Sequence, residues 1–151
     1  MDELYWIAIR CQLSKEQWVA RAIAREGFES SCPMDVRSYR PSPHSKRRRV
    51  YEVPLIPKIV FAQIPAFEEN LMANVKYVLG LHRDAGGVIL TIPPSQMARF
   101  HEGHSAWLER ARKAHAIGQP GKVKKPKWRS LDALREFFDP ETGEILEQKV
   151  A

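Results

Sequence analysis

The stretch that most constrains the fold of this chain runs from Tyr51 to Ile64 and reads YEVPLIPKIVFAQI. Its apolar run Ile59–Ala62 is typical of a buried strand, and Pro54 and Pro57 stand just before it. Because proline has no amide hydrogen to give a sheet ladder, the two prolines mark where one strand ends and a core strand begins. Four consecutive cations, Lys46 to Arg49, lie directly upstream. We therefore expect a charged arm and a buried strand back to back.

Positive charge is concentrated in two segments that contain no acidic residue. The formal net charge is +6, and the segment Arg37–Arg49 carries six Lys or Arg residues while Arg110–Arg129 carries eight. Acid-free blocks of this kind favour a polyanionic partner, of which nucleic acid is the first candidate. The alternative is that the charge serves solubility alone.

The length and composition indicate one domain with an appendage. The chain has 151 residues, of which 28% are charged, and its apolar runs are far shorter than the roughly 20 residues that cross a membrane. The N-terminal MDELYWIAIR begins with acids and does not resemble a signal peptide. We expect a cytoplasmic protein in which Cys11 and Cys32 are free core thiols, with a disulfide between them as the alternative.

The order of predicted elements indicates an α+β domain. Strands are expected at 4–10, 28–32, 35–40, 50–53, 58–64, 75–81 and 88–92, and helices at 15–26, 67–74 and from about Ser95 to Ala116. Ser14 and Gln17 have the spacing of a capping box for the first helix, and Gly27 is placed to end it. Residues 41–49 are expected to form a hairpin tip. No glycine-rich phosphate loop follows a strand, which removes the main dinucleotide-binding fold.

The composition changes after Ile117. Residues 118–129 are basic and lack periodicity, which predicts a linker. Ser130 can cap a short helix, LDALREFF, after it. We therefore divide the chain into a domain at residues 1–117 and a tail at 118–151.

Several motifs, in order along the chain, resemble the N-terminal domain of the NusG family of transcription elongation factors, which includes RfaH-like paralogues. They are the aromatic-led Tyr5–Ala8, the helix and strand of KEQWVARAIAREGFE with the following Cys32–Pro33, the basic hairpin, the segment Val53–Phe61, then Val78–Leu81 and Ile92–Pro93. The resemblance extends from Tyr5 to about Arg99. It implies a four-stranded antiparallel sheet flanked by helices, here followed by the basic linker and the short C-terminal helix.

The resemblance implies a non-enzymatic factor that binds RNA polymerase, suppresses pausing and promotes antitermination in a bacterial or phage-infected cell. The alternatives are an inhibitor or pausing factor of the same family and, from another class, a free-standing RNA- or DNA-binding module. Residues 118–151 lack the strand pattern of the KOW-type barrel that family members usually carry. We expect a factor without that barrel, monomeric when free.

In the family, an apolar depression holds the tip of the clamp helices of the polymerase β′ subunit, and a nearby helix contacts the gate loop of the β subunit. The residues that resemble the first surface are Trp6, Ile9, Ile56, Pro57, Ile59, Phe61, Val78 and Leu81, and those on the second are Asn70 and Leu71. The alternative for each apolar residue is that it fills the core. Because strand side chains alternate, Ile59 and Phe61 share one face and Val60 takes the other. Ile56 and Ile59 stand where the family prefers aromatic residues.

Three groups of residues are candidates for nucleic-acid contact. The hairpin cations are expected to meet phosphates of upstream or non-template DNA, and they are Arg37, Arg40, Lys46, Arg47, Arg48 and Arg49. The residues that resemble those reading the non-template strand in RfaH-like proteins are Gln12, Lys15, Arg21 and Lys76. The linker places Trp128 among Lys124, Lys125, Lys127 and Arg129, which suits stacking on a single strand such as nascent RNA. The alternative for each is a solvated surface charge.

Catalytic and metal-binding classes find little support in the sequence. His101 and His104 lie three residues apart around Glu102, yet HEGH is not the HExxH zinc motif and no carboxylate or cysteine cluster supplies further ligands. No serine or cysteine has a candidate base at motif spacing. We predict neither an enzyme nor a cofactor.

Overall fold

A computed structural model describes residues 4–65, 74–83 and 85–126. Nearly all of the helix expected at 67–74 lies outside the described residues, as does the short helix expected after Ser130. Asn70, Leu71, Lys127, Trp128 and Arg129 are outside them as well. Within the described part, no helix combines the length and the apolar character needed to cross a membrane.

The centre of the fold is an antiparallel sheet built around β1 (Trp6–Cys11). On one side of β1 lies β5 (Ile59–Gln63), with β2 (Glu29–Ser31) beyond it. The other side is shared by β6 (Val78–Leu81), which pairs with the end of β1, and the short β7 (Thr91–Ile92), which pairs with its start. The predicted α+β class is confirmed. The expected four strands are present in the order β2-β5-β1-β6, and β7 adds a fifth.

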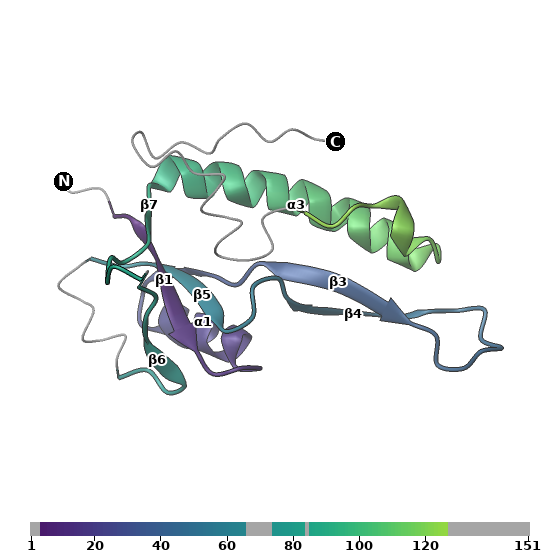
Figure 1. The fold of residues 1–151 in the computed structure, drawn as a ribbon, viewed down its shortest axis with the longest axis horizontal. Helices are drawn as coiled ribbons and strands as arrows, with labels where there is room; N and C mark the ends of the chain where they lie inside the picture. Colours follow the sequence, from purple (N-terminus) through teal and green to yellow (C-terminus); the bar gives the residue numbers. More distant parts are fainter. Residues whose placement is uncertain (1–3, 66–73, 84, 127–151) are drawn as a thin grey trace.

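Helices cover both faces of this sheet (Figure 1), α1 (Glu16–Arg25) on one face and α3 (Pro94–Ala116) on the other. Trp6 and Ala8 of β1 join the core under α3, while the intervening Ile7 joins the core under α1. Along β5, Ile59 and Phe61 belong to the α3 side and Val60 to the α1 side, so the predicted alternation is confirmed. One sheet therefore separates two apolar cores.

Two further strands, β3 (Met34–Tyr39) and β4 (Arg49–Pro54), form a separate antiparallel ribbon. The ribbon and the turn at its end project from the sheet as an arm, and α3 runs alongside it (Figure 1). The arm predicted from the prolines and the cation run is thus present. Leu55 follows the ribbon directly and is bonded back to Pro33, its N–H donating to the carbonyl oxygen at 2.8 Å. This bond closes the base of the arm where the core strand begins.

The predicted capping box of the first helix is wrong. Ser14 has a φ of 71°, and α1 begins at Glu16 with no side-chain hydrogen bond at its N-cap, Lys15. A turn takes the place of the cap, because the Lys15 N–H donates to the Gln12 carbonyl at 3.1 Å. The left-handed backbone at Ser14 turns the chain from β1 into the helix. A serine in that conformation does not have the extended backbone that an N-cap requires.

Residues 118–126, which we call the strap, are packed against α3 and do not behave as the predicted linker. The Gln119 N–H donates to the Ala114 carbonyl at 2.8 Å, and the Trp107 indole Nε1–H donates to the Lys124 carbonyl at 3.0 Å. A short 3-10 helix, η2 (Pro120–Lys122), lies between these bonds, and Val123 packs on the core under α3. Gly118, with φ 75°, reverses the chain at the end of α3. The fold therefore extends beyond Ile117.

Candidate functional site

The structure divides the apolar residues expected to contact polymerase into buried and accessible groups. Five side chains lie inside the cores, with exposed fractions of 8% or less, and they are Trp6, Ile9, Ile56, Ile59 and Phe61. Val78 and Leu81 are half-buried, and Pro57 is exposed. Ile9 belongs to the core under α1, whereas the other four belong to the core under α3. The buried residues thus come from both sides of the sheet. Pro57, Val78 and Leu81 are the members of this group that solvent reaches.

The accessible members lie near one corner of the sheet, where β1 ends. The Cys11 N–H donates to the Lys58 carbonyl at 2.9 Å, which brings Pro57 to this corner, and Cys11 also pairs with Val78. The register between β1 and β6 shifts here, so that Leu79 is an extra residue between Val78 and Gly80. Such a bulge re-aims a side chain, and Leu79 is 58% exposed.

Arg10 completes this corner. It is exposed, and it follows Trp6 and Ala8 on the face that α3 covers farther back. Its partners across the sheet are Ile59 and Gly80. We call Arg10, Pro57, Leu79 and Gly80 the open sheet end. Leu79 is the exposed apolar residue next to Gly80, one strand partner of Arg10, and the other strand partner of Arg10 is the buried Ile59.

The arm is fastened to α3 by side chains on one face of the ribbon. Arg112 of α3 forms a two-pronged ion pair with Glu52 of β4, at 2.7 and 3.3 Å. His104 Nε2 lies 2.8 Å from the Met34 carbonyl, and His101 Nε2 lies 2.8 Å from Ser31 Oγ in neighbouring β2. These contacts position the arm relative to the sheet.

The hydroxyl of Ser38 in β3 contacts both Arg48, which directly precedes β4, and His115 near the end of α3. Arg48 Nε donates to Ser38 Oγ at 2.9 Å, and its Nη2 donates to the Ser38 carbonyl at 3.2 Å. Ser38 Oγ also lies 2.6 Å from His115 Nδ1. Because a guanidinium only donates, the hydroxyl oxygen accepts from Arg48, and it can contact His115 at the same time because a hydroxyl donates one hydrogen bond and accepts two. Arg48 is therefore half-buried and engaged within the fold.

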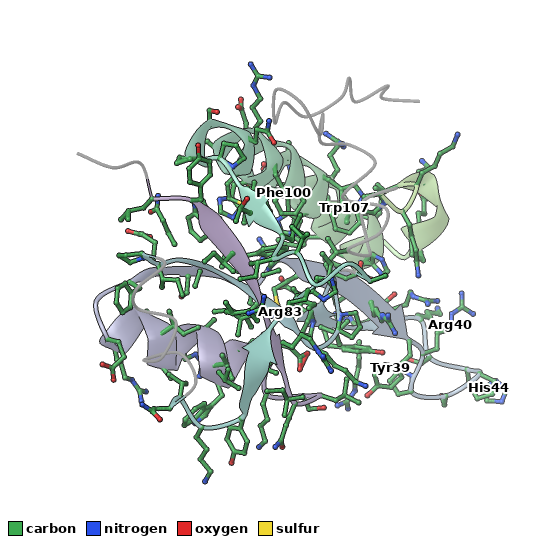
Figure 2. All side chains as sticks on the ribbon, turned by 60° about the vertical axis from the view of Figure 1, so that its left-hand side comes forward. Tyr39, Arg40, His44, Arg83, Phe100 and Trp107 are labelled. Carbon is green, nitrogen blue, oxygen red and sulfur yellow. The ribbon has the colours of Figure 1, made fainter. Side chains whose placement is uncertain are left out.

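The remaining hairpin cations are exposed. Arg37, Arg40, Lys46, Arg47 and Arg49 all present their charges to solvent, and Figure 2 shows Arg40 on the arm beyond Tyr39, with His44 farther out. Arg37 Nε lies 3.7 Å from Asp35 Oδ2 in a long ion pair. The arm therefore carries a set of accessible cations of the kind that contacts phosphates.

The second predicted group, drawn from distant parts of the sequence, converges on one aromatic ring. Lys15 Nζ and Lys76 Nζ lie 4.8 and 5.0 Å from the centroid of the Tyr77 ring, and Trp18 meets the same ring edge-on at 5.0 Å. Gln12 joins them because its N–H donates to the Tyr77 carbonyl at 3.0 Å. We call Gln12, Lys15, Trp18, Lys76 and Tyr77 the Tyr77 cluster. Arg21 is exposed on α1 and is not part of this cluster.

Sequence reasoning missed the aromatic half of this cluster. Trp18 is 40% exposed on α1, and Tyr77 falls within the strand expected at 75–81 although its φ is 71° and β6 begins after it. The signal in the sequence was the pair Lys76–Tyr77. That pair alone does not predict the cluster, because Lys15 reaches the Tyr77 ring only through the pairing of β6 with β1.

The third predicted group is only partly described. Lys124 and Lys125 are exposed on the strap. Burial lowers the pKa of His115, and the charges of Arg48 and Lys125 lower it further. Lys127, Trp128 and Arg129 lie outside the described residues. The basic character of the strap therefore reaches the side of α3 that faces the arm.

The histidines and cysteines take part in packing. Among the residues that the structure describes, no group of three His, Cys, Asp or Glu side chains is arranged to hold a metal ion. Both cysteines are free, as predicted. Burial, with the nearby Glu16 carboxylate, raises the pKa of Cys11 to about 11 and that of Cys32 to about 12. Thiols with such pKa values are poor nucleophiles at neutral pH.

A family model matches most of the described chain. The model described as "Transcription termination factor nusG" matches residues 4–101. The matched range contains the sheet, the whole arm, the open sheet end, the Tyr77 cluster and the first turns of α3. A comparison with curated proteins gave no match.

Proposed function

This chain belongs to the NusG family, and from that premise we propose that it binds transcribing RNA polymerase at the β′ clamp helices and promotes elongation. Proteins of this family are non-enzymatic transcription factors that generally bind RNA polymerase. The observation that carries the proposal is that the family match spans both the open sheet end and the basic arm. A single domain thus holds an apolar surface and a basic one.

In this proposal, the open sheet end receives the tip of the clamp helices. Leu79 supplies an exposed apolar contact, and Arg10 supplies a charged rim that fixes the register of the partner. The residues beneath them, including Ile59, shape the surface from the core without touching the partner. Ile56 and Ile59 therefore affect polymerase binding indirectly, through the shape of the surface that lies over them.

The basic surfaces then restrain DNA. The arm cations meet phosphates of the upstream duplex or the displaced strand, and the Tyr77 cluster offers two ammonium groups beside an aromatic ring. A factor held at both places bridges the cleft and favours the closed clamp. Pausing falls only if the factor binds the active state more tightly than the paused state.

The test is binding to purified polymerase with and without the clamp-helix tip. Leu79→Asp should weaken binding about 10- to 100-fold, since full burial of a leucine contributes roughly 1.5–3 kcal/mol and a buried unpaired carboxylate opposes contact. Ile117→Asp is the matched control, because Ile117 is similarly exposed at 66% but lies at the end of α3. Equal binding of the unaltered protein to intact and tip-deleted polymerase would refute the proposal.

The sign of the effect needs a second measurement. Readthrough of a terminator on a defined template should rise with the protein and stay at the basal level with Leu79→Asp. Increased arrest would instead identify an inhibitor or pausing factor of the same family. The basic arm and the Tyr77 cluster also favour a second candidate, a nucleic-acid-binding module, which would bind DNA or RNA and leave polymerase unbound.

A further inference from the structure

A cavity of about 460 Å³ lies where the strap, α3 and the β3–β4 ribbon meet. Its α3 wall is formed by Trp107, Ala111 and His115, which are spaced four residues apart and therefore share one face of the helix. The strap folds back along α3 (Figure 1) and is held there by the hydrogen bonds at Gln119 and Lys124. Cavities of roughly 300–1,000 Å³ are typical of sites for small organic ligands.

Positive charge reaches this cavity from two segments. Arg37 of the ribbon and Lys125 of the strap both line it, and both are exposed. Asp35 also lines it, with its Oδ2 3.7 Å from Arg37 Nε. Burial lowers the pKa of His115, the charges of Arg48 and Lys125 lower it further, and Asp35 acts in the opposite direction. The cations therefore outweigh the carboxylate at this place, which favours an anionic ligand.

The rest of the lining combines rings and aliphatic groups with neutral polar groups. Trp107 and Val123 form apolar wall, and Tyr51 adds a ring that is 44% exposed. The Ser38 hydroxyl and the His115 imidazole, 2.6 Å apart, supply hydrogen-bonding groups. A ligand that matches all of these groups has a planar ring, hydroxyl groups and an anionic end.

We propose that the cavity binds a free mononucleotide, with its phosphate held by Arg37 and Lys125 and its base packed against Tyr51 and Trp107. A nucleotide joins a planar base, a hydroxylated sugar and an anion in one molecule. A guanidinium meets a phosphate through two parallel hydrogen bonds, and an aromatic ring stacks on any base. The bound nucleotide would contact the strap, α3 and the ribbon together, so its binding holds the strap in place.

The test titrates the full chain with AMP by isothermal titration calorimetry, and with adenosine and ribose 5-phosphate as the two parts of that ligand. AMP should saturate one site at millimolar concentration or below. Each part should bind at least about tenfold more weakly, a loss of about one decade in the dissociation constant. Absence of saturation by AMP would overturn the site. Equal binding of ribose 5-phosphate would overturn the contact with the base.

Matched variants locate the ligand. Lys125→Glu should weaken AMP binding about five- to tenfold, because repulsion replaces the attraction of an exposed charge pair. Lys124→Glu makes the same charge change at a neighbouring exposed residue that is not among those lining the cavity, and it should change binding by less than about twofold. Tyr51→Ala should cost about 5- to 50-fold, with Tyr5→Ala as its control, since Tyr5 is similarly exposed at 43%.

Two outcomes of these titrations would overturn the proposal. Equal losses in Lys125→Glu and Lys124→Glu would mean that AMP responds to the overall charge alone. An oligothymidylate that displaces AMP and binds more tightly would assign the cavity to a nucleic-acid strand and not to a free nucleotide. Unfolding midpoints of all variants show whether each one keeps its fold.

Hydrogen exchange gives a second readout at the strap. At an AMP concentration of about ten times the dissociation constant, amide exchange at Gln119 and Lys122 should slow by about threefold or more, because the ligand stabilises the state that binds it. Exchange in β1 should stay at its original rate. Unchanged exchange at both strap amides with AMP bound would place the ligand elsewhere and overturn the site. All these measurements use the free chain, so their outcome is independent of the polymerase assay.

Discussion

Ser38 connects the arm to the rest of the molecule with a single hydroxyl. It accepts a hydrogen bond from Arg48 and contacts His115, so one small side chain joins β3, the residue before β4 and the end of α3. We predict that Ser38→Ala lowers the free energy of unfolding by about 1–2 kcal/mol, since two hydrogen bonds are lost and each contributes about 0.5–1.5 kcal/mol. Urea unfolding measures the change. Ser42→Ala, in the exposed turn, is the control and should change it by less than about 0.5 kcal/mol.

Single residues also show which parts of the site the sequence could predict. The alternation of Ile59, Val60 and Phe61 follows from strand geometry and is confirmed. The convergence of Lys15 and Lys76 on one ring depends on how β6 pairs with β1, which no local pattern determines. The left-handed backbone at Ser14 and Tyr77 is likewise imposed by tertiary structure.

At the scale of elements, α3 is bound to the strands beside it by three histidines. Burial lowers the pKa of His101, His104 and His115, and nearby positive groups (His104 for the first, Arg112 for the second, Arg48 and Lys125 for the third) lower it further. For His104, the Met34 bond and the charges of Asp35 and Glu52 act in the opposite direction, as does Asp35 for His115. The balance favours neutral imidazoles in the folded protein.

We predict that the folded state loses stability as the pH falls from about 7.5 to about 5. A histidine whose folded pKa lies below its unfolded value of about 6.5 binds fewer protons when folded, so stability is fully present above that value and declines below it. Urea midpoints across this range measure the decline. His104→Gln keeps a donor for the Met34 carbonyl but does not titrate, and it should flatten the curve. An unchanged curve in that variant would contradict a contribution from His104.

The ends of α3 were predictable from the sequence, whereas its contact with the β3–β4 ribbon was not. The paired prolines before Ser95 and the glycine after Ile117 bound the helix, which the structure places at Pro94–Ala116. Its contact with the ribbon joins segments about 70 residues apart, as in the bond of His104 to Met34. Histidines at 101, 104 and 115 carry no signal for such a contact in sequence, because polar helix positions are usually solvated.

At the scale of the whole molecule, the strap packs against α3 and is bonded to it at Ala114 and Trp107. We predict that Trp107→Phe, which removes the indole donor to the Lys124 carbonyl but keeps an aromatic ring, speeds amide exchange at Gln119 and Lys122 by about three- to tenfold. The loss of one hydrogen bond worth about 0.5–1.5 kcal/mol gives this range. Hydrogen exchange followed by NMR is the measurement. Amides of β1 should exchange at their original rate, and a matching increase there would mean that the whole fold had loosened.

The fold was predictable because one sheet with two covered faces demands near-continuous apolar strands at its centre, and β1 and β5 supply them. The candidate site was less predictable because its accessible residues occur where regular pairing stops. Leu79 is exposed at a bulge, and Lys15 and Lys76 meet at Tyr77, whose φ is 71°. Sequence patterns indicate which residues are buried, and five of the eight residues that resemble the family's surface lie in the cores.

The length of α3 has a consequence for how a partner is selected. The helix has 23 residues, a span of about 34 Å at 1.5 Å per residue, and it ties the sheet at one end and the arm at the other. The orientation of the arm relative to the sheet is therefore fixed by a stiff helix before any encounter. A partner that engages both the sheet and the arm must match that orientation, and the ordering cost of aligning them has already been met in folding. A partner of the wrong shape is thereby rejected.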